Sequence, residues 1–202
     1  VIAAAADSGC RLISRYGIGY DNIDVAAATE RGLLVTYVPD YCLDEVADHA
    51  MALLLALARR VHHAGLAVRD GDWKVPQGAV HRIQGRRLAV IGVGGIGRRV
   101  VDRARAFGIE AVGVDPYLKE WNVAAERASS FVDAVAEADY ISLHVPLTDE
   151  NRHLIDAESI AVMRRAPIVV NTARGPLVDM DAAVEALDSC RLGGVALDVT
   201  ET

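Results

Sequence analysis

The chain has 202 residues, of which 52% are hydrophobic and only 5% aromatic, and its formal net charge is −7. This length is enough to bury an aliphatic core in one large domain, or in one domain with part of another. The negative charge argues against a direct nucleic-acid partner, which needs a basic face. No apolar run approaches the ~20 residues that span a bilayer. Three cysteines, far apart in the sequence, match no zinc spacing and suit a reducing cytoplasm. We therefore expect a cytoplasmic protein with no metal site.

The first part of the chain predicts short elements followed by one long helix. Residues 11–14 form an apolar segment, 24–31 a short helix that Gly32 ends, and 33–38 a strand that stops at Pro39. Residues 44–68 have helical periodicity. The face we expect to be buried carries Val46, Ala50, Leu53, Leu54 and Leu57. The polar stretch 70–84, which contains glycine and proline, is predicted to be a loop.

From residue 87 onward, apolar strands alternate with amphipathic helices. We predict strands over 87–91, 110–114, 140–144, 167–171 and 194–198, with a very short one over 129–131. We predict helices over 95–107, 132–138, 156–163 and 179–189. Continuous apolar strands between such helices indicate a parallel sheet covered on both faces. The expected fold class is α/β, a Rossmann-type doubly wound parallel sheet.

A glycine motif follows the first of these strands. The run Gly92-Val93-Gly94-Gly95-Ile96-Gly97 fits G-x-G-x-x-G and opens a helix, the context in which this motif binds a dinucleotide pyrophosphate. Asp115 ends the next strand, where a carboxylate accepts from the ribose hydroxyls and repels a 2′-phosphate. The pattern predicts NAD rather than NADP. The alternative is a glycine-rich turn that binds nothing, with Asp115 as a solvated turn residue.

Arg174 lies at the exit of the predicted strand 167–171. A planar guanidinium offers two parallel donors to a carboxylate, so this residue is a candidate substrate anchor. The alternative is a structural ion pair.

Five motifs in order resemble those of the D-isomer-specific 2-hydroxyacid dehydrogenases, with phosphoglycerate-dehydrogenase-like and C-terminal-binding-protein-like members as the nearest in wording. The motifs span residues 15–24 (RYGIGYDNID), 44–50 (DEVADHA), 141–148 (ISLHVPLT), 171–175 (NTARG) and 196–199 (ALDV). The resemblance implies that residues 1–38 are a remnant of a flavodoxin-like substrate domain. It implies that 39–202 are an NAD-binding Rossmann domain, with 39–84 as interdomain helix and dimerisation arm of a homodimer.

The resemblance also assigns roles to residues. Arg174 would bind the substrate carboxylate and polarise the C2 oxygen, and the backbone N–H groups of Gly17, Ile18 and Gly19 would contact the same carboxylate. Thr172 and Ala173 would line the nicotinamide, and Asp198 would bond its carboxamide. The glycine motif, including Gly95 and Ile96, would also contact the cofactor. The remaining cofactor contacts would be Asp115, His144, Val145, Pro146 and Asn151. An ordinary loop at 17–19 and a turn-capping role for Asp198 are the alternatives.

The family mechanism that the resemblance implies also needs a glutamate and a histidine. The pattern D-V-x-x-x-E places the glutamate just past Thr202, and Glu201 is two positions early, so we expect a chain truncated at both ends and inactive by itself. Tyr37 and Thr200 depart from the residues common in the family at those positions. The expected function is hydride transfer between NAD and a D-2-hydroxy acid or 2-keto acid. The alternative is an NAD(H)-sensing, dimeric, corepressor-like module with little turnover.

Overall fold

The structure is a computed structural model that describes residues 1–73, 80 and 82–201. It separates into two compact units, Val1–Leu43 and Asp44–Thr202. The boundary therefore falls a few residues after the predicted one at Val38. Part of the predicted loop 70–84 lies outside the described residues, and its described positions belong to no helix or strand.

The first unit contains two parallel strands and two short helices. Strands β1 (Leu12–Ser14) and β2 (Leu34–Thr36) pair with Leu12 opposite Leu34. Helix α2 (Val25–Glu30) begins where the Asp24 side chain accepts a hydrogen bond from the Ala27 N–H at 2.8 Å. Helix α1 (Ile2–Asp7) was not predicted from the sequence, and none of its residues is buried.

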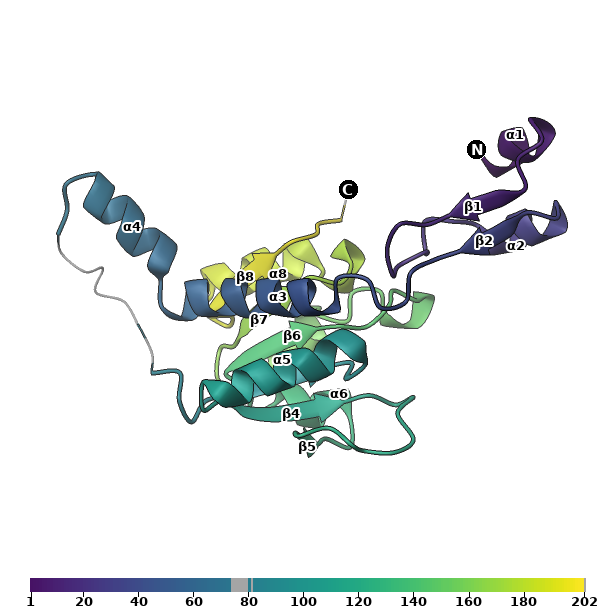
Figure 1. Ribbon diagram of the computed structural model, residues 1–202. Helices are drawn as coiled ribbons and strands as arrows, with labels where there is room; N and C mark the ends of the chain where they lie inside the picture. The colour runs from purple at the N-terminus through teal and green to yellow at the C-terminus, as the bar shows by residue number, and fades with distance from the viewer. Residues whose placement is uncertain (74–79, 81, 202) are drawn as a thin grey trace. The chain divides into compact units, whose positions relative to one another are not determined.

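The second unit is built on a six-stranded, all-parallel sheet (Figure 1). Its strands are β3 (Arg87–Ile91), β4 (Glu110–Val114), β5 (Glu126–Arg127), β6 (Tyr140–Leu143), β7 (Ile168–Asn171) and β8 (Gly194–Leu197). The spatial order is β5-β4-β3-β6-β7-β8. The chain therefore runs outward from β3 in one direction and returns at β6 to continue in the other. This reversal creates the switch point at which doubly wound sheets bind ligands.

Helices cover both faces of the sheet, as the sequence predicts. On one face, α3 (Leu43–Ala58) and α5 (Gly95–Ala106) pack Leu54 and Val100 against strand residues such as Val90. The other face buries residues of α6 (Phe131–Val135), α7 (Ala157–Val162) and α8 (Met180–Asp188). Two 3₁₀ turns, η1 (Asp149–Asn151) and η2 (Gly175–Leu177), follow β6 and β7. The predicted fold class is confirmed.

The prediction of one helix over 44–68 is wrong. Helix α3 ends at Ala58, and α4 (Val61–Arg69) follows after a bend of 59°. Arg60 stands at the break with φ of 50°, a left-handed conformation that no helix interior contains. Among the described residues no single helix is long and apolar enough to cross a membrane. The bent pair α3 and α4 reaches that length and hydropathy only when both helices are taken together.

The buried face of α3 also differs from the predicted one. Its buried residues are Ala47, Ala50, Met51, Leu54 and Ala58. Val46, Leu53 and Leu57 are only partly buried. Three of these five residues are alanines, whose small side chains let the helix approach the sheet closely, whereas apolar periodicity favours the larger residues.

The predicted strand over 129–131 is wrong as well. The edge strand β5 lies slightly earlier, at Glu126–Arg127, and Ser130 instead caps α6 by accepting from the Asp133 N–H at 3.1 Å. Serine competes for backbone hydrogen bonds and so favours helix starts over strand interiors.

Candidate functional site

The glycine loop between β3 and α5 is shaped by contacts within the protein. Gly92 has φ of +86°, and a Cβ there would lie 2.6 Å from the carbonyl oxygen of His144. A Cβ at Gly97 would overlap the carbonyl oxygen of Gly92. A Cβ at Gly94, by contrast, would meet nothing within 4 Å. The first and third glycines are thus required by the fold itself, whereas the second borders open space into which a ligand can approach the backbone.

Helix α5 begins at this open space. Gly94 is its N-cap, and no side chain caps the first turn. The N–H groups of Gly95, Ile96 and Gly97 have no partner inside the helix, because the first turn of an α-helix lacks preceding carbonyls. Together with the helix dipole, they favour an anion such as a pyrophosphate. Gly95 is exposed, and Ile96 packs its side chain against the core.

Asp115 follows β4 and is tied to the glycine loop. One carboxylate oxygen accepts from the Val93 N–H at 3.1 Å, and the other from the Tyr117 N–H at 3.0 Å. Sequence reasoning assigned Asp115 to a ribose and missed this structural bond. Each carboxylate oxygen can accept a second hydrogen bond, so the residue still has capacity for ribose hydroxyls.

The segment after β6 forms the other side of the switch point. The His144 N–H donates to the Ile91 carbonyl at 2.7 Å, and its ring Nε2 lies 2.8 Å from the Ser142 hydroxyl. Burial lowers the pKa of His144 to about 4, so the imidazole is neutral at pH 7. A Cβ at Gly92 would lie 2.8 Å from Val145. His144 and Val145 therefore form a wall directly beside the glycine loop.

Asn151 braces the loop that follows this wall. Its amide donates to the Pro146 carbonyl at 2.7 Å and accepts from the Thr148 N–H at 2.8 Å. Pro146 itself is exposed. The structure thus gives Asn151 an internal role in holding the loop, which the sequence did not reveal.

The segment after β7 carries the candidate anchor. Asn171 is fully buried, and its side chain accepts from the Ala173 N–H at 3.0 Å and donates to the Arg174 carbonyl at 2.7 Å. Arg174 is half-buried and donates from Nη1 to the Ala173 carbonyl at 2.7 Å. Asn171 is therefore a positioning residue that fixes the Thr172–Arg174 turn. The motif contained it, but sequence reasoning gave it no role.

Thr172 provides a test of whether this turn fits a polar ligand group. Its hydroxyl oxygen is buried, and within the described part of the chain it has no hydrogen-bond partner. A buried hydroxyl without a partner is costly, and a ligand amide or hydroxyl would satisfy it. Together with the open space at Gly94, this residue fits the nicotinamide-lining position that the resemblance implies.

Asp198 follows β8 and pairs with a histidine on α3. Its carboxylate lies 3.4 Å from His49 Nε2, and both side chains are about half exposed. The Asp198 N–H donates to the Asn171 carbonyl at 3.0 Å, which ties the ends of β8 and β7 together. The carboxylate is thus held at the same sheet edge as Thr172.

The segment beyond β8 passes over Gly175, where a Cβ would overlap the backbone of Thr200 and Glu201. Glu201 pairs with Arg152 and lies 2.9 Å from His153 Nε2. These partners anchor the segment and give Glu201 a structural role.

The loop over Gly17, Ile18 and Gly19 belongs to the first unit. The Arg15 side chain donates to the Gly19 carbonyl at 2.9 Å, and the Gly17 carbonyl accepts from the Val38 N–H at 3.1 Å. Within the described residues, the N–H groups of Ile18 and Gly19 donate no hydrogen bond. Tyr37, which departs from the residue common in the family at its position, also belongs to the first unit. Its ring centroid lies 5.0 Å from that of Tyr20.

The parallel sheet gathers most of the candidate residues at one edge. The glycine loop, Asp115, the His144 wall, the Thr172–Arg174 turn and Asp198 each follow the carboxyl end of a different strand. Among the described residues, no group of three or more histidine, cysteine, aspartate or glutamate side chains could hold a metal ion. The site thus offers a loop that favours an anion, a carboxylate that can accept from a ribose, an uncharged wall and a guanidinium.

Comparisons with known proteins agree with this geometry. Residues 51–202 match the family model described as D-isomer specific 2-hydroxyacid dehydrogenase, NAD binding domain. A D-3-phosphoglycerate dehydrogenase of Methanocaldococcus jannaschii is 44% identical over 95% of this chain and 37% of its own length. A hydroxypyruvate reductase of Thermotoga maritima is 40% identical over 97% of this chain and 64% of its own length.

Solved structures give the same result. A D-lactate dehydrogenase from Aquifex aeolicus, complexed with NAD and lactic acid, matches with a TM-score of 0.87 and 33% identity over 95% of this chain and 58% of that one. The D-lactate dehydrogenase from Escherichia coli matches with a TM-score of 0.86 and 34% identity over 98% of this chain and 63% of that one. The chain thus spans less than two thirds of the length of these relatives. The family model covers most of the second unit, and the chain therefore belongs to the D-isomer specific 2-hydroxyacid dehydrogenase family and carries its NAD-binding domain.

Proposed function

We propose that the protein that carries this chain transfers a hydride between NAD and a D-2-hydroxy acid or its 2-keto acid, with Arg174 anchoring the substrate carboxylate. The observation that carries the proposal is the Thr172–Arg174 turn, which Asn171 fixes at the same sheet edge as the glycine loop. The chain spans only part of each named relative, so the activity is proposed for the intact protein.

The residues divide the work between binding and orientation. When bound, NAD supplies the nicotinamide carbon that accepts the hydride. The Arg174 guanidinium offers paired donors to the substrate carboxylate and withdraws charge from the C2 oxygen. Thr172 and Asp198 hold the nicotinamide side of the site. His144 is not the proton donor at pH 7, because burial keeps its pKa at about 4.

The substrate class follows from what the named relatives share. Phosphoglycerate dehydrogenase, hydroxypyruvate reductase, glyoxylate reductase and D-lactate dehydrogenase all act on short 2-hydroxy or 2-keto acids. We therefore propose a short 2-hydroxy acid as the substrate of this protein and leave the substituent on its C2 carbon open.

The test is NADH formation by the intact protein across a panel of D-2-hydroxy acids, and NADH consumption with the matching 2-keto acids. Replacement Arg174→Gln should lower kcat/KM by about 100-fold or more, since it removes the group that orients the substrate. The affinity for NAD should stay within about twofold of the unmodified protein. The matched control Arg105→Gln changes an exposed arginine on α5 and should leave both quantities unchanged. No turnover with any acid of the panel would overturn the proposal.

The alternative of an NAD(H)-sensing module gains no support from the named relatives, all of which are dehydrogenases or reductases. We nevertheless propose a homodimer, formed through the arm 39–84. Helix α4 buries none of its residues, and the Trp73 side chain is 85% exposed. Sedimentation of the intact protein should give twice the monomer mass, and Trp73→Ser should raise the monomer fraction. A monomeric unmodified protein would overturn this assembly.

We also propose a reducing, cytoplasmic location, on the basis of the three scattered free cysteines. Cell fractionation of the source organism tests it, and recovery of the protein outside the cytoplasm would contradict it.

A further inference from the structure

Three stretches of the second unit meet beside Arg174, at the carboxyl edge of the sheet, where the strands end. They are residues 152–155, 175–179 and 200–201, which follow β6, β7 and β8. Backbone hydrogen bonds join the first two. The His153 N–H donates to the Pro176 carbonyl at 2.7 Å, and the Ile155 N–H donates to the Leu177 carbonyl at 3.0 Å. The middle stretch begins directly after Arg174, so its position fixes the chain on one side of that arginine.

Side chains hold the third stretch. Its backbone lies on Gly175, where a Cβ would overlap Thr200 and Glu201. Within the part of the chain that the structure describes, no backbone hydrogen bond joins this stretch to the other two. The Glu201 carboxylate instead pairs with Arg152 and lies 2.9 Å from His153 Nε2. Arg152, His153 and Glu201 thus form a clamp that holds the third stretch against the second.

The His153 ring is fixed from a second side. Its Nδ1 lies 3.8 Å from the carboxylate of Asp179, which caps α8 by accepting from two N–H groups of the first turn. The His153 backbone has φ of 54°, a left-handed conformation that a non-glycine residue keeps only where its surroundings compensate for the strain. The His153 hydrogen bond and the Arg152 charge hold the pKa of Glu201 below its usual value, so its carboxylate is ionised at neutral pH.

The clamp lies next to two residues of the candidate site. Asp198 precedes Glu201 by three positions, and Arg174 directly precedes Gly175. A loosened third stretch would therefore free the chain on one side of both. A misplacement of about 1 Å in a substrate-orienting group can cost about 100-fold in rate, so a small displacement of Arg174 is enough to affect catalysis. The glycine loop takes no part in these contacts, so binding of the NAD pyrophosphate should not depend on them.

We propose that Arg152 and His153 are positioning residues of this site: they hold the third stretch on Gly175 and thereby keep Arg174 oriented toward the substrate carboxylate. Both act through the Glu201 carboxylate, and neither is assigned a contact with substrate or cofactor. The effect on turnover rests on the function proposed above, whereas the clamp itself is measurable without turnover.

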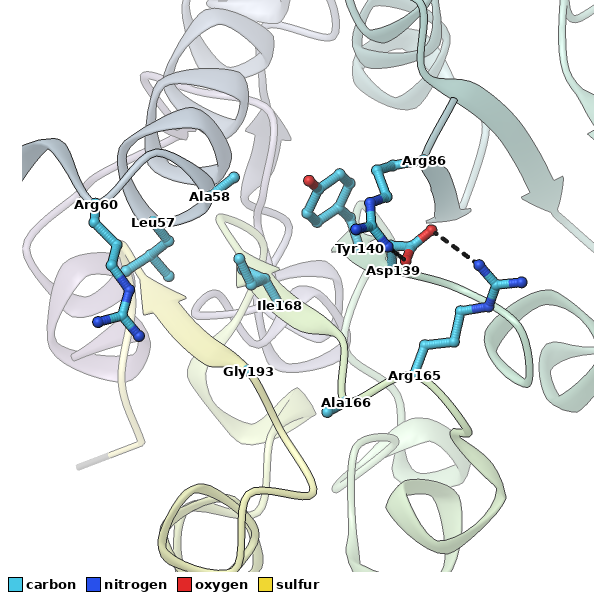
Figure 2. A pocket seen from close by; sticks show the side chains of 10 residues that line it. All are labelled: Leu57, Ala58, Arg60, Arg86, Asp139, Tyr140, Arg165, Ala166, Ile168 and Gly193. Carbon is cyan, nitrogen blue, oxygen red and sulfur yellow. Dashed lines mark hydrogen bonds and ion pairs between the residues drawn. The ribbon is translucent and has the colours of Figure 1, made fainter. Parts of the chain in front are cut away.

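Ion pairs at the opposite, amino edge of the sheet, where the strands begin, provide a comparison. There Asp139, only 8% exposed, accepts from Arg86 Nη1 at 2.7 Å, and Arg165 Nη1 lies 3.7 Å from the same carboxylate. Figure 2 shows both guanidinium groups beside Asp139. Arg164 pairs with Glu137 at this edge, and its side chain is 73% exposed. It is therefore the matched control for the arginine of the clamp.

The experiment compares His153→Ala, His153→Gln and Arg152→Gln in the intact protein. Alanine and glutamine share the cost of the left-handed backbone, but only glutamine can donate to the Glu201 carboxylate. We expect His153→Ala to lower kcat/KM for the 2-hydroxy acid about tenfold, mostly through KM, with NAD affinity within about twofold of the unmodified protein. His153→Gln should restore kcat/KM to within about threefold. Arg152→Gln should lower it about threefold, because this pair is more exposed.

Hydrogen exchange of residues 173–178, followed by mass spectrometry, reports the clamp without turnover. It should become about fivefold faster in His153→Ala. Arg164→Gln should change neither exchange nor kcat/KM. The proposal is overturned by unchanged exchange and kcat/KM in His153→Ala, by an equal loss in His153→Gln, or by an equal effect of Arg164→Gln. Absence of turnover in the unmodified protein would instead contradict the proposed function, and the exchange rates would still decide whether the clamp exists.

Discussion

The two edges of the six-stranded sheet are held in shape by different means. At the carboxyl edge, close backbone contacts fix the glycine loop, because side chains at Gly92 and Gly97 would collide with neighbouring backbone. At the amino edge, charged side chains fix the structure, with Asp139 joining Arg86 to the start of β3. A dinucleotide pyrophosphate is bound by main-chain N–H groups, so the glycine loop, which is open at Gly94, suits it, whereas the amino edge offers guanidinium groups.

The largest expected effect concerns the glycines of the carboxyl edge. Gly97→Ala should destabilise the protein by about 3 kcal/mol or more, since the added methyl group overlaps a backbone oxygen that cannot move aside. Gly94→Ala should cost less than about 1 kcal/mol, because the space is open and φ is −70°, and only the poorer N-cap preference of alanine opposes it. It should nevertheless weaken NAD binding about tenfold by blocking the approach to the backbone.

Urea unfolding and NAD titration of both variants separate the two roles. Unchanged NAD affinity in Gly94→Ala would show that a ligand does not approach the loop backbone. Wild-type stability in Gly97→Ala would refute the steric account.

The second effect tests the amino edge. Asp139→Ala should lower the free energy of unfolding by about 3 kcal/mol, because it leaves Arg86 without its buried partner. Glu137→Ala removes a carboxylate that is 44% exposed and pairs with two arginines, and it should cost less than about 1 kcal/mol. Urea unfolding measures both. Equal losses would mean that burial of Asp139 does not matter.

The third effect is a pH dependence that originates at the wall beside the glycine loop. The folded pKa of His144 is about 4, below the unfolded value of 6.5, so the unfolded chain binds the extra proton between these values. The stability that the neutral His144 side chain contributes is complete above pH 6.5. It is lost as the pH falls toward 4, by up to about 3 kcal/mol. Between pH 6.5 and pH 4, the free energy of unfolding of His144→Gln should therefore fall by less than that of the unmodified protein. Parallel pH profiles of variant and unmodified protein would contradict this assignment.

The fourth effect is smaller and concerns Asn171. Asn171→Ala should cost about 2 kcal/mol in unfolding, because the Ala173 N–H and the Arg174 carbonyl lose their partner. It should also lower kcat/KM through a displaced Arg174. Restoration of kcat/KM by Asn171→Asp would be incompatible with the donor role of the amide, since a carboxylate cannot donate to the carbonyl.

These two edges also differ in how far the sequence predicts them. The strands over 87–91 and 110–114 were predicted to the residue, because a buried parallel strand is a continuous apolar run that glycine or aspartate ends. The glycine loop followed from its spacing and its place between strand and helix. The carboxyl edge is readable because local patterns encode it.

The amino edge was not predicted, because Arg86, Asp139 and Arg165 are far apart in the sequence and only the sheet topology brings them together. The break at Arg60 was missed for a related reason: the apolar periodicity continues through it, and periodicity carries no signal for a single left-handed residue. Likewise, the bracing bonds of Asn171 and Asn151 depend on turn geometry that residue type alone does not specify.

We propose that NAD binds at the carboxyl edge of the sheet and not at the amino edge. The most direct measurement is a calorimetric titration of NAD into the unmodified protein, Asp115→Asn and Asp139→Asn, which change matched aspartates at opposite edges. We expect NAD to bind the unmodified protein, Asp115→Asn to weaken this binding about tenfold, and Asp139→Asn to change it by less than about twofold. Absence of binding by the folded unmodified protein, or equal weakening by the two variants, would contradict it.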